Sequence, residues 1–352
     1  MNEDTIHAHI IARTGWGPTG PGARQWFLSR RIAAALAELS RRMPGTRSLL
    51  LGGSFARGEP CMPLMGDDVR CLSDFDFVLV GDKETPLPPL REFLHDHADL
   101  FCNVSCYAIT QEEYLRLETG VGHDLKTDGL LIGGPAPPQA KPVRLTFRDA
   151  SDLLTFCAIE ILESGVFEVP ERELDRPERQ YLIHRFFSYP LRSFLLLDGA
   201  CGLADTARLG GQLGDLPSRN IAWRFGKTAD FPLVRKNIMQ ALAFALAEHR
   251  MRGYLAVEAD TISGSSLAQD AEAQQAIAVQ QFALSLIDAL IAKVDVTPDQ
   301  RLPEVLNTLW RDCRGRAPAV GGAPGPSAAD WFGAVAPWYR TVLFRMKTAV
   351  QA

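Results

Sequence analysis

The stretch Ser48–Val80, SLLLGGSFARGEPCMPLMGDDVRCLSDFDFVLV, contains two coupled patterns. Its end, SDFDFVLV, is short and rich in aromatic and β-branched residues, which predicts a β-strand. Side chains on a strand alternate between its two faces. We therefore expect Asp74 and Asp76 on one face of this strand, while Phe75 and Phe77 point from the other face into a core.

The two aspartates are candidate ligands of a metal ion. Neighbouring carboxylates repel each other and are costly to remove from water, and a divalent cation relieves both effects. Mg²⁺ is commonly held by one or two carboxylates, with substrate phosphates and water as its other ligands. Two solvated acids on an edge strand explain the spacing of Asp74 and Asp76 equally well, so this pair alone does not decide.

The start of the stretch favours the metal site. Leu49-Leu50-Leu51 ends in Gly52-Gly53-Ser54 and continues with FARGE, which predicts a strand that turns into a short helix. Glycines let the backbone approach a ligand closely, and the N–H groups at a helix start can hold a phosphate. Ser54 adds a hydroxyl, and Arg57 adds a fixed positive charge. An ordinary glycine turn explains Gly-Gly-Ser alone, but this turn placed before an acidic pair is a more specific pattern.

Together these residues resemble the signature of the DNA polymerase β-like nucleotidyltransferase superfamily. That signature is a hydrophobic residue, Gly-Ser, a spacer, and Asp-x-Asp between hydrophobic residues. In the family, Gly-Ser binds the triphosphate and the two aspartates bind Mg²⁺. The resemblance therefore implies these roles for Gly53, Ser54, Asp74 and Asp76. It extends to no named subfamily.

The sequence departs from the family in the spacer, which is longer than usual between Ser54 and Asp74. Residues 61–70 are interpreted as a small hairpin inserted before the acidic strand, with Gly66-Asp67-Asp68 as its turn.

A second departure concerns the third carboxylate that the family normally places on the next strand. That strand is predicted at residues 100–108, where Asn103 stands about at the expected position and no acid is present. An amide oxygen can bind a metal, but it cannot take a proton from an attacking hydroxyl. Either Asp128 or Glu59 supplies the acid, or the protein binds nucleotide without transferring it well.

Composition bounds the class of protein. The 352 residues favour two domains, and 46% hydrophobic with 22% charged residues is typical of a soluble globular protein. A net charge of −5 argues against a nucleic-acid partner, because such a partner usually requires a basic face. Neither an apolar run long enough to span a membrane, nor a signal-peptide pattern, nor a C-x-x-C pair is present. We therefore expect a cytoplasmic protein with free cysteines.

The N-terminal part, residues 1–140, is predicted as an α+β nucleotidyltransferase-type domain with a mixed sheet and flanking helices. Residues 1–24 are predicted as a loop or arm. Residues 25–42 predict a helix, ended by Pro44-Gly45, with an apolar stripe of Phe27, Ile32, Ala35, Leu36 and Leu39. A helix at 90–99, a helix opened by the capping box Thr110–Glu113 and a last short strand near 130–134 follow. Asp128 lies near the edge of the predicted site or is a turn residue before Gly129.

The proline-rich stretch 134–142 predicts a linker, and residues 141–352 predict a helical bundle. Asp149-Ala150-Ser151-Asp152 can cap its first helix, which runs through Glu163. Further helices are predicted at about 178–197, 203–213, 233–252, 265–294, 301–312 and 330–349. The resemblance implies that this domain closes over the nucleotide and holds the acceptor.

Basic and aromatic residues are interleaved in one part of the predicted bundle: Arg219, Trp223, Arg224, Phe225, Lys227, Phe231, Arg235 and Lys236. They could form a wall that holds the triphosphate, with Lys227 as a nucleotide-binding candidate. A solvated surface with a few aromatic anchors is the favoured interpretation.

The main hypothesis is an Mg²⁺-dependent nucleotidyltransferase. It would move a nucleoside monophosphate from a nucleoside triphosphate, expected to be ATP, to a hydroxyl or phosphate of a small acceptor and release pyrophosphate. Asp74, Asp76 and Asp128 are the catalytic candidates, and Asp74, Asp76 and Asn103 are the metal-ligand candidates. No P-loop motif and no nucleophile elbow of a serine hydrolase is present.

Two other hypotheses stay open. The first is a nucleotide-binding or regulatory protein on a catalytically degenerate scaffold, which the missing acid at Asn103 motivates. The second is an aminoglycoside-type adenylyltransferase, which a cleft lined with acids would support and which the basic stretch 219–236 disfavours.

Overall fold

The computed structural model describes residues 1–43, 47–81, 88–101, 103–169, 173, 177–199, 202–227, 235–254, 271–294, 301–320 and 324–348. The chain divides into two compact units. The first consists of Met1–Leu145, Gly202–Ala207 and Pro217–Phe231, and the second of Thr146–Cys201, Arg208–Leu216 and Pro232–Ala352. The chain therefore returns to the first unit twice after the predicted boundary at residue 140.

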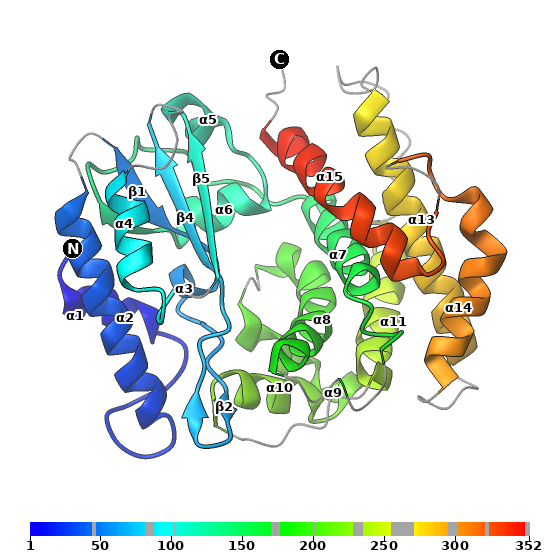
Figure 1. Cartoon of the computed structure of the whole chain (residues 1–352), viewed down its shortest axis with the longest axis horizontal. Helices are drawn as coiled ribbons and strands as arrows, with labels where there is room; N and C mark the ends of the chain where they lie inside the picture. Colours follow the sequence, from blue (N-terminus) through cyan, green and yellow to red (C-terminus); the bar gives the residue numbers. More distant parts are fainter. Residues whose placement is uncertain are drawn as a thin grey trace. The chain divides into compact units, whose positions relative to one another are not determined.

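The first unit is built on a mixed sheet with the strand order β5-β4-β1-β6 (Figure 1). Its strands are β1 Ser48–Leu51, β4 Phe75–Val80, β5 Val104–Ile109 and β6 Leu130–Gly133. β1 is antiparallel to both β4 and β6, whereas β4 and β5 are parallel. The predicted α+β class, with a mixed sheet in the N-terminal half and a helical C-terminal region, is confirmed. The nucleotidyltransferase-type assignment of the sheet stays a prediction.

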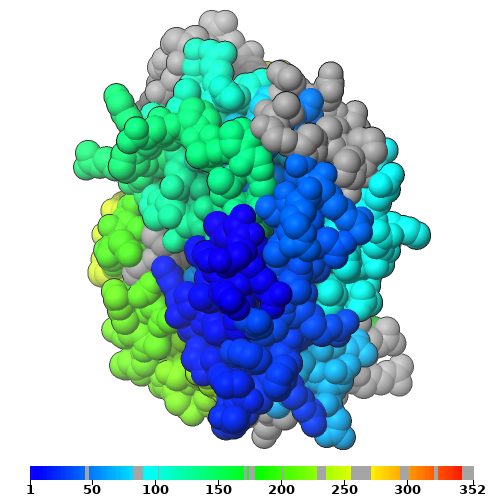
Figure 2. Space-filling view, turned by 90° about the vertical axis from the view of Figure 1, so that its left-hand side faces the viewer, coloured from blue at the N-terminus to red at the C-terminus, as the bar shows by residue number. Residues whose placement is uncertain are grey.

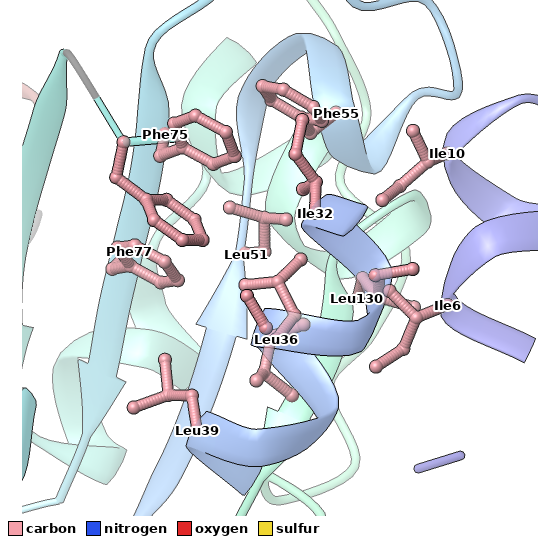
Figure 3. Packing of buried hydrophobic residues seen from close by; sticks show 14 of the residues in the cluster. Ile6, Ile10, Ile32, Leu36, Leu39, Leu51, Phe55, Phe75, Phe77 and Leu130 are labelled. Atoms are coloured by element: carbon pink, nitrogen blue, oxygen red, sulfur yellow. The ribbon is translucent and has the colours of Figure 1, made fainter. Parts of the chain in front are cut away.

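Helices pack on both faces of this sheet: α2 Ala23–Arg42, α4 Pro88–Asp96, α5 Gln111–Arg116 and α6 Gly120–Thr127. One core joins α2 and α4 to Leu51, Phe75 and Phe77, whose side chains point toward α2 in Figure 3. The opposite core joins α5 and α6 to Leu50 and Val78. Side chains of β1 and β4 thus alternate between two cores, as the period of a strand requires.

The N-terminal residues form a helix, α1 Glu3–Ile10, so the predicted loop or arm is wrong for this segment. The Asn2 side chain accepts the backbone N–H of Thr5 at 2.9 Å and caps the helix. Ile6 and Ile10 are fully buried in the core that they share with α2 (Figure 3). Figure 2 shows the dark blue N-terminal residues lying against the lighter blue residues of α2. An Asn cap followed by isoleucines one turn apart was the signal for this helix.

Helix α2 begins at Ala23 and confirms the predicted helix, with one error in its apolar stripe. Ile32, Leu36 and Leu39 are fully buried, but Phe27 is 57% exposed. At 3.6 residues per turn, Phe27 lies about half a turn around the helix from Leu36, so the two cannot share a buried face. The Phe27 ring instead packs edge-on against Trp26, with centroids 5.1 Å apart.

Two local predictions in the first unit are confirmed. The inserted hairpin forms from β2 Leu64–Met65 and β3 Asp68–Val69, joined by a two-residue turn in which Gly66 has φ +64°. Thr110 and Glu113 form the predicted capping box at the start of α5. Helix α6, in contrast, was not predicted, although Thr119 caps it through the N–H of Gly122.

The second unit is helical: α7 Phe147–Glu163, α8 Pro177–Leu195, η2 Leu196–Asp198, α9 Gly210–Leu213, α11 Arg235–Met251, α13 Ala271–Val294, α14 Leu302–Cys313, η6 Arg314–Arg316 and α15 Ala328–Thr348. The predicted helix 203–213 is interrupted, because η3 Leu203–Leu209 precedes α9. The short helix α10 Leu216–Arg224 leads back into the first unit. Residues 233–234, 265–270 and 349 of the predicted helices lie outside the described residues.

Helix α7 begins earlier than predicted. Its N-cap is Thr146, whose backbone N–H donates to the Asp149 carboxylate at 2.8 Å. Asp149 therefore lies within the first turn of the helix and is not its cap. The predicted cap within Asp149–Asp152 is wrong, because Thr146-x-x-Asp149 forms a capping box three residues upstream.

Among the described residues, one helix is long and apolar enough to cross a membrane. It is the segment Ala271–Lys293 of α13. Core helices of soluble proteins have the same length and composition, and Val279, Ile287 and Leu290 are buried inside the second unit. The expected absence of a membrane span stays a prediction.

The packing of α8 on α11 contains a buried polar pair. His249 Nε2 and Ser193 Oγ are 2.7 Å apart, and neither side chain has exposed area. Burial, assisted by the positive charge of Arg252, lowers the pKa of His249 to about 4. The folded protein therefore keeps this imidazole neutral, whereas the unfolded chain protonates it near its ordinary pKa.

Acid is accordingly expected to destabilise the protein through His249. The unfolded state binds the proton below about pH 6.5 and the folded state only near pH 4, so the free energy of unfolding falls between these values. The full loss is about 3 kcal/mol, of which about 2 kcal/mol appears on going from pH 7.5 to pH 5. Urea unfolding at both pH values should show a smaller loss for His249→Gln. Equal losses in the two proteins would contradict a neutral buried His249.

Candidate phosphate and metal site

The end of β1 turns into a four-residue helix, α3 Gly53–Ala56. Gly53 adopts φ +65°, and a Cβ placed on it would lie 2.1 Å from Oδ2 of Asp76. The backbone N–H of Gly52 donates to the Asp76 carbonyl at 2.8 Å. The glycine turn and the second aspartate of Asp-x-Asp, which the sequence places in separate strands, are therefore in direct contact.

The residues of α3 are held by contacts outside the helix, because a single turn is not stable by itself. The Phe55 ring stacks on Phe75, with centroids 4.1 Å apart (Figure 3). The imidazole Nε2 of His9 hydrogen-bonds to the carbonyl of Ala56, and the N–H of Arg13 donates to the carbonyl of Gly58. Helix α1 and the residues after it thus support the turn.

Asp74 and Asp76 are half-buried, whereas Phe75 and Phe77 are completely buried. This alternation is the one that the sequence predicts. Asp76 lies on the face of the sheet that α6 covers, because a Cβ at Gly52 would be 3.7 Å from Asp76 Cβ and 3.8 Å from Leu125 Cδ1.

The long spacer does not separate the serine of the glycine turn from the acidic strand. The inserted hairpin is closed at its base, where the N–H of Leu72 donates to the Cys61 carbonyl at 2.9 Å. The N–H of Cys61 donates to Ser73 Oγ at 2.7 Å, and Ser73 Oγ lies 2.8 Å from Ser54 Oγ. The hairpin is therefore an insertion whose base, at Cys61, is bonded to the serine pair.

Strand β5, which pairs with β4 in parallel, contains no acidic residue next to the aspartates. Asp76 stands in register with Ser105, and the carbonyl of Asn103 accepts the N–H of Phe75 at 2.8 Å. Asn103 is exposed and directly precedes β5. The structure thus places the predicted ligand Asn103 beside the Asp74–Asp76 segment, immediately before the strand that pairs in parallel with β4.

Arg57 and Glu59 belong to a buried ion-pair network. Arg57 Nε donates to Glu59 Oε1 at 2.8 Å, and Arg57 Nη1 donates to Asp124 Oδ2 at 2.5 Å. Glu59 is 1% exposed, and its Oε2 accepts the N–H of Leu203 at 2.7 Å. The Arg224 guanidinium donates twice to the Glu59 carbonyl, at 3.2 and 3.1 Å.

This network changes the interpretation of two candidates. The predicted phosphate ligand Arg57 is already matched by two carboxylates, and both carboxylate oxygens of Glu59 are used inside the fold. Asp124, which binds Arg57 from α6, was not among the predicted site residues. A Thr-capped helix in this region would have placed Asp124 next to the site face.

Asp128 lies at the C-terminal end of α6 and is half-buried. Burial raises its pKa, and the negative charge of Asp124 adds to the effect, while Arg13, Arg57 and His123 act in the opposite direction. Two of the charges that act on Asp128, those of Arg57 and Asp124, belong to the ion-pair network described above. A raised pKa moves the Asp128 carboxyl group toward the range of a general base.

The basic stretch 219–236 does not form one wall. Arg224 is buried on the Glu59 loop, whereas Arg235 is buried in the second unit, where its Nε donates to the Val166 carbonyl at 3.0 Å. Lys227 is exposed, with its Nζ 5.9 Å from the Phe225 ring. Phe225 is buried, as expected for an aromatic anchor, and Phe231 lies outside the described residues.

Two aspartates with hard oxygen donors fit the partial ligand set of Mg²⁺, which takes its other ligands from phosphates and water. Within the described part of the chain, no group of three or more His, Cys, Asp and Glu side chains could enclose a metal.

Comparison of the chain with protein families, with curated proteins and with solved structures gives no match.

Proposed function

We propose that this protein is an Mg²⁺-dependent nucleotidyltransferase that acts on a small molecule. The observation that carries the proposal is the contact of the Gly53 turn with Asp76. A turn able to approach a triphosphate and a carboxylate able to hold its Mg²⁺ meet at one point, with Asp74 on the same side of the strand. Such a juxtaposition is what a nucleotide·Mg²⁺ complex requires.

In this proposal the chain acts mainly by positioning and by charge. The backbone of Gly53 and the hydroxyl of Ser54 bind phosphate oxygens of the nucleoside triphosphate, expected to be ATP. Asp74 and Asp76 would hold Mg²⁺, which would supply charge neutralisation at the phosphates. The acceptor hydroxyl or phosphate attacks the α-phosphorus, and pyrophosphate leaves. Asp128 is proposed to take the proton from the acceptor, since its raised pKa favours that task.

The roles of the remaining candidates follow from their surroundings. Arg57 acts through the turn that it supports, because Glu59 and Asp124 occupy its guanidinium. Lys227 is retained as a phosphate contact because its side chain is exposed. The second unit is proposed to hold the acceptor, and the net charge of −5 favours a small-molecule acceptor in the cytoplasm over nucleic acid.

Binding of nucleotide without transfer is the second candidate function. The register of β4 with β5 favours it, since Ser105 and Asn103 occupy the positions beside the aspartates and neither can act as a base. The two functions share the nucleotide site and differ only in whether pyrophosphate is released.

The test is incubation of the protein with each α-labelled nucleoside triphosphate, Mg²⁺ and a small-molecule extract of cells. We expect label transfer and pyrophosphate release from the wild type. Asp74→Asn and Asp76→Asn should each abolish transfer while circular dichroism and the urea midpoint stay close to those of the wild type. The matched control is Asp67→Asn in the exposed hairpin turn, which should keep full transfer.

The outcomes separate the two candidates. Transfer that survives in either Asp74→Asn or Asp76→Asn would contradict the proposed metal site. Nucleotide binding by calorimetry without any pyrophosphate release would favour the binding protein over the enzyme.

A further inference from the structure

The hydroxyl of Ser54 is paired with a second buried hydroxyl, that of Ser73. The two Oγ atoms are 2.8 Å apart, and the residues are 8% and 2% exposed. Ser73 Oγ also accepts the backbone N–H of Cys61 at 2.7 Å. Since Ser73 directly precedes Asp74, the hydroxyl pair lies between the glycine turn and the aspartates.

The direction of the hydrogen bond between the two hydroxyls depends on what Ser54 contacts. A serine hydroxyl has one proton and two lone pairs, and the N–H of Cys61 engages one lone pair of Ser73. In the structure Ser54 donates its proton to Ser73. A phosphate oxygen carries only lone pairs, so Ser54 can bind it only by turning that proton toward the phosphate.

The same contact can then be made in the opposite direction. When the Ser54 proton turns away, the Ser73 hydroxyl can donate its own proton to Ser54 Oγ. Only the two O–H bonds rotate, each proton stays on its own oxygen, and both heavy atoms keep their positions. Accepting a proton also makes the Ser54 hydroxyl a better donor, because hydrogen bonds in a chain polarise one another.

We propose that Ser73 is a positioning residue for Ser54, which orients the Ser54 proton toward a phosphate oxygen of the bound nucleotide. This inference rests on the proposed function. Ser73 does not touch the nucleotide, and the Cys61 N–H at the base of the inserted hairpin fixes its oxygen. The base of the hairpin thus contributes to the site, because the Cys61 N–H donates to Ser73 Oγ and holds that oxygen in place.

A double-mutant cycle tests the inference. Calorimetry in the presence of Mg²⁺ gives the Kd of the wild-type protein for each of ATP, GTP, CTP and UTP. The nucleotide that the wild type binds best is then used for Ser54→Ala, Ser73→Ala and the double variant. We expect each single change to raise the Kd about tenfold, and the double variant to be no worse than Ser54→Ala. Ser29→Ala, a buried serine bonded to His7 and to the Trp26 carbonyl, is the matched control and should leave the Kd unchanged.

A merely structural role would give a different pattern. If Ser73 acted only by holding the Cys61 loop, Ser73→Ala would raise the Kd by the same factor with and without the Ser54 hydroxyl. That additive result would overturn the inference and leave the proposed function intact. Failure of the wild type to bind any of the four nucleotides would overturn the proposed function, and this inference with it.

A second variant covers the case in which Ser73→Ala does not fold, because it leaves the buried N–H of Cys61 without an acceptor. Ser73→Cys keeps the size of the side chain and replaces the hydroxyl by a thiol, a weak donor and acceptor. The cycle with Ser73→Cys should again be non-additive, with a smaller rise in Kd. Additivity in this cycle would equally overturn the inference.

Discussion

Replacement of Gly53 by alanine is expected to lower the free energy of unfolding by about 3 kcal/mol and to abolish the proposed nucleotide binding. Gly53 has φ +65°, where a Cβ is strained by about 1–2 kcal/mol. The new Cβ would also lie 2.1 Å from Oδ2 and 3.2 Å from Cγ of Asp76. Because the Gly52 N–H is bonded to the Asp76 carbonyl, the backbone of the turn stays in place, and the Asp76 carboxylate has to rotate away from the new Cβ.

Gly66 provides the matched control for this prediction. It has nearly the same backbone conformation, φ +64°, but no atom lies within 4 Å of its Cβ position. Gly66→Ala should therefore show the backbone strain alone, about 1 kcal/mol, and leave the proposed nucleotide binding unchanged. Urea unfolding and calorimetry with Mg²⁺ and nucleotide measure both effects. Equal losses of stability in the two variants would show that contact with Asp76 adds nothing to the strain.

The sequence predicted the parts of the site that depend on local rules. The alternation of Asp74 and Asp76 with buried phenylalanines follows from the period of a strand, and Gly53 follows from the conformation that a tight turn needs. The extra residues of the spacer were also correctly predicted to form a hairpin, since Gly66 and Asp67 favour a hairpin turn. Each of these features needs only a few neighbouring residues.

The network behind the turn could not be predicted in this way. Glu59 binds Leu203 and Arg224, which are 144 and 165 positions away in the chain. The basic stretch around Arg224 was interpreted as surface because nothing local marks a return to the first unit. Glu59 likewise looks like an ordinary charged residue after a glycine, and only the tertiary fold makes it a buried acceptor.

Two predictions about the fold were wrong although the local sequence contained the signal. Helix α1 was missed although Ile6 and Ile10 have helical spacing, because the glycine-rich residues that follow it dominated the interpretation. Phe27 was assigned to the core on hydrophobicity, whereas its angle on the helix places it in water. The hydrophobicity of Phe27 predicted burial and its position in the helical period predicted exposure, and the period gave the correct answer.

Replacement of Glu59 by glutamine is expected to lower the free energy of unfolding by about 3 kcal/mol. The change removes the charge that compensates Arg57, whose side chain is 6% exposed, and leaves a buried guanidinium with Asp124 as its carboxylate partner. It also turns an ionised acceptor of the Leu203 N–H into a neutral amide, which weakens the attachment of Gly202–Ala207 to the first unit. Urea unfolding measures the loss, and faster proteolysis near Leu203 should accompany it.

Glu112→Gln is the matched control, because Glu112 pairs with Arg116 on the exposed surface of α5, where the side chains are 68% and 51% exposed. Such a pair contributes at most about 0.5 kcal/mol. A second variant, Arg57→Met with Glu59→Gln, removes the buried guanidinium together with the charge of Glu59. The carboxylate that it leaves, Asp124, is 27% exposed and can be solvated, so this variant should recover part of the stability that Glu59→Gln loses. A loss for Glu59→Gln as small as that for Glu112→Gln would mean that the pair is not buried in solution. Failure of the double variant to recover stability would instead assign the loss to the Leu203 attachment, because that bond is weakened in both variants.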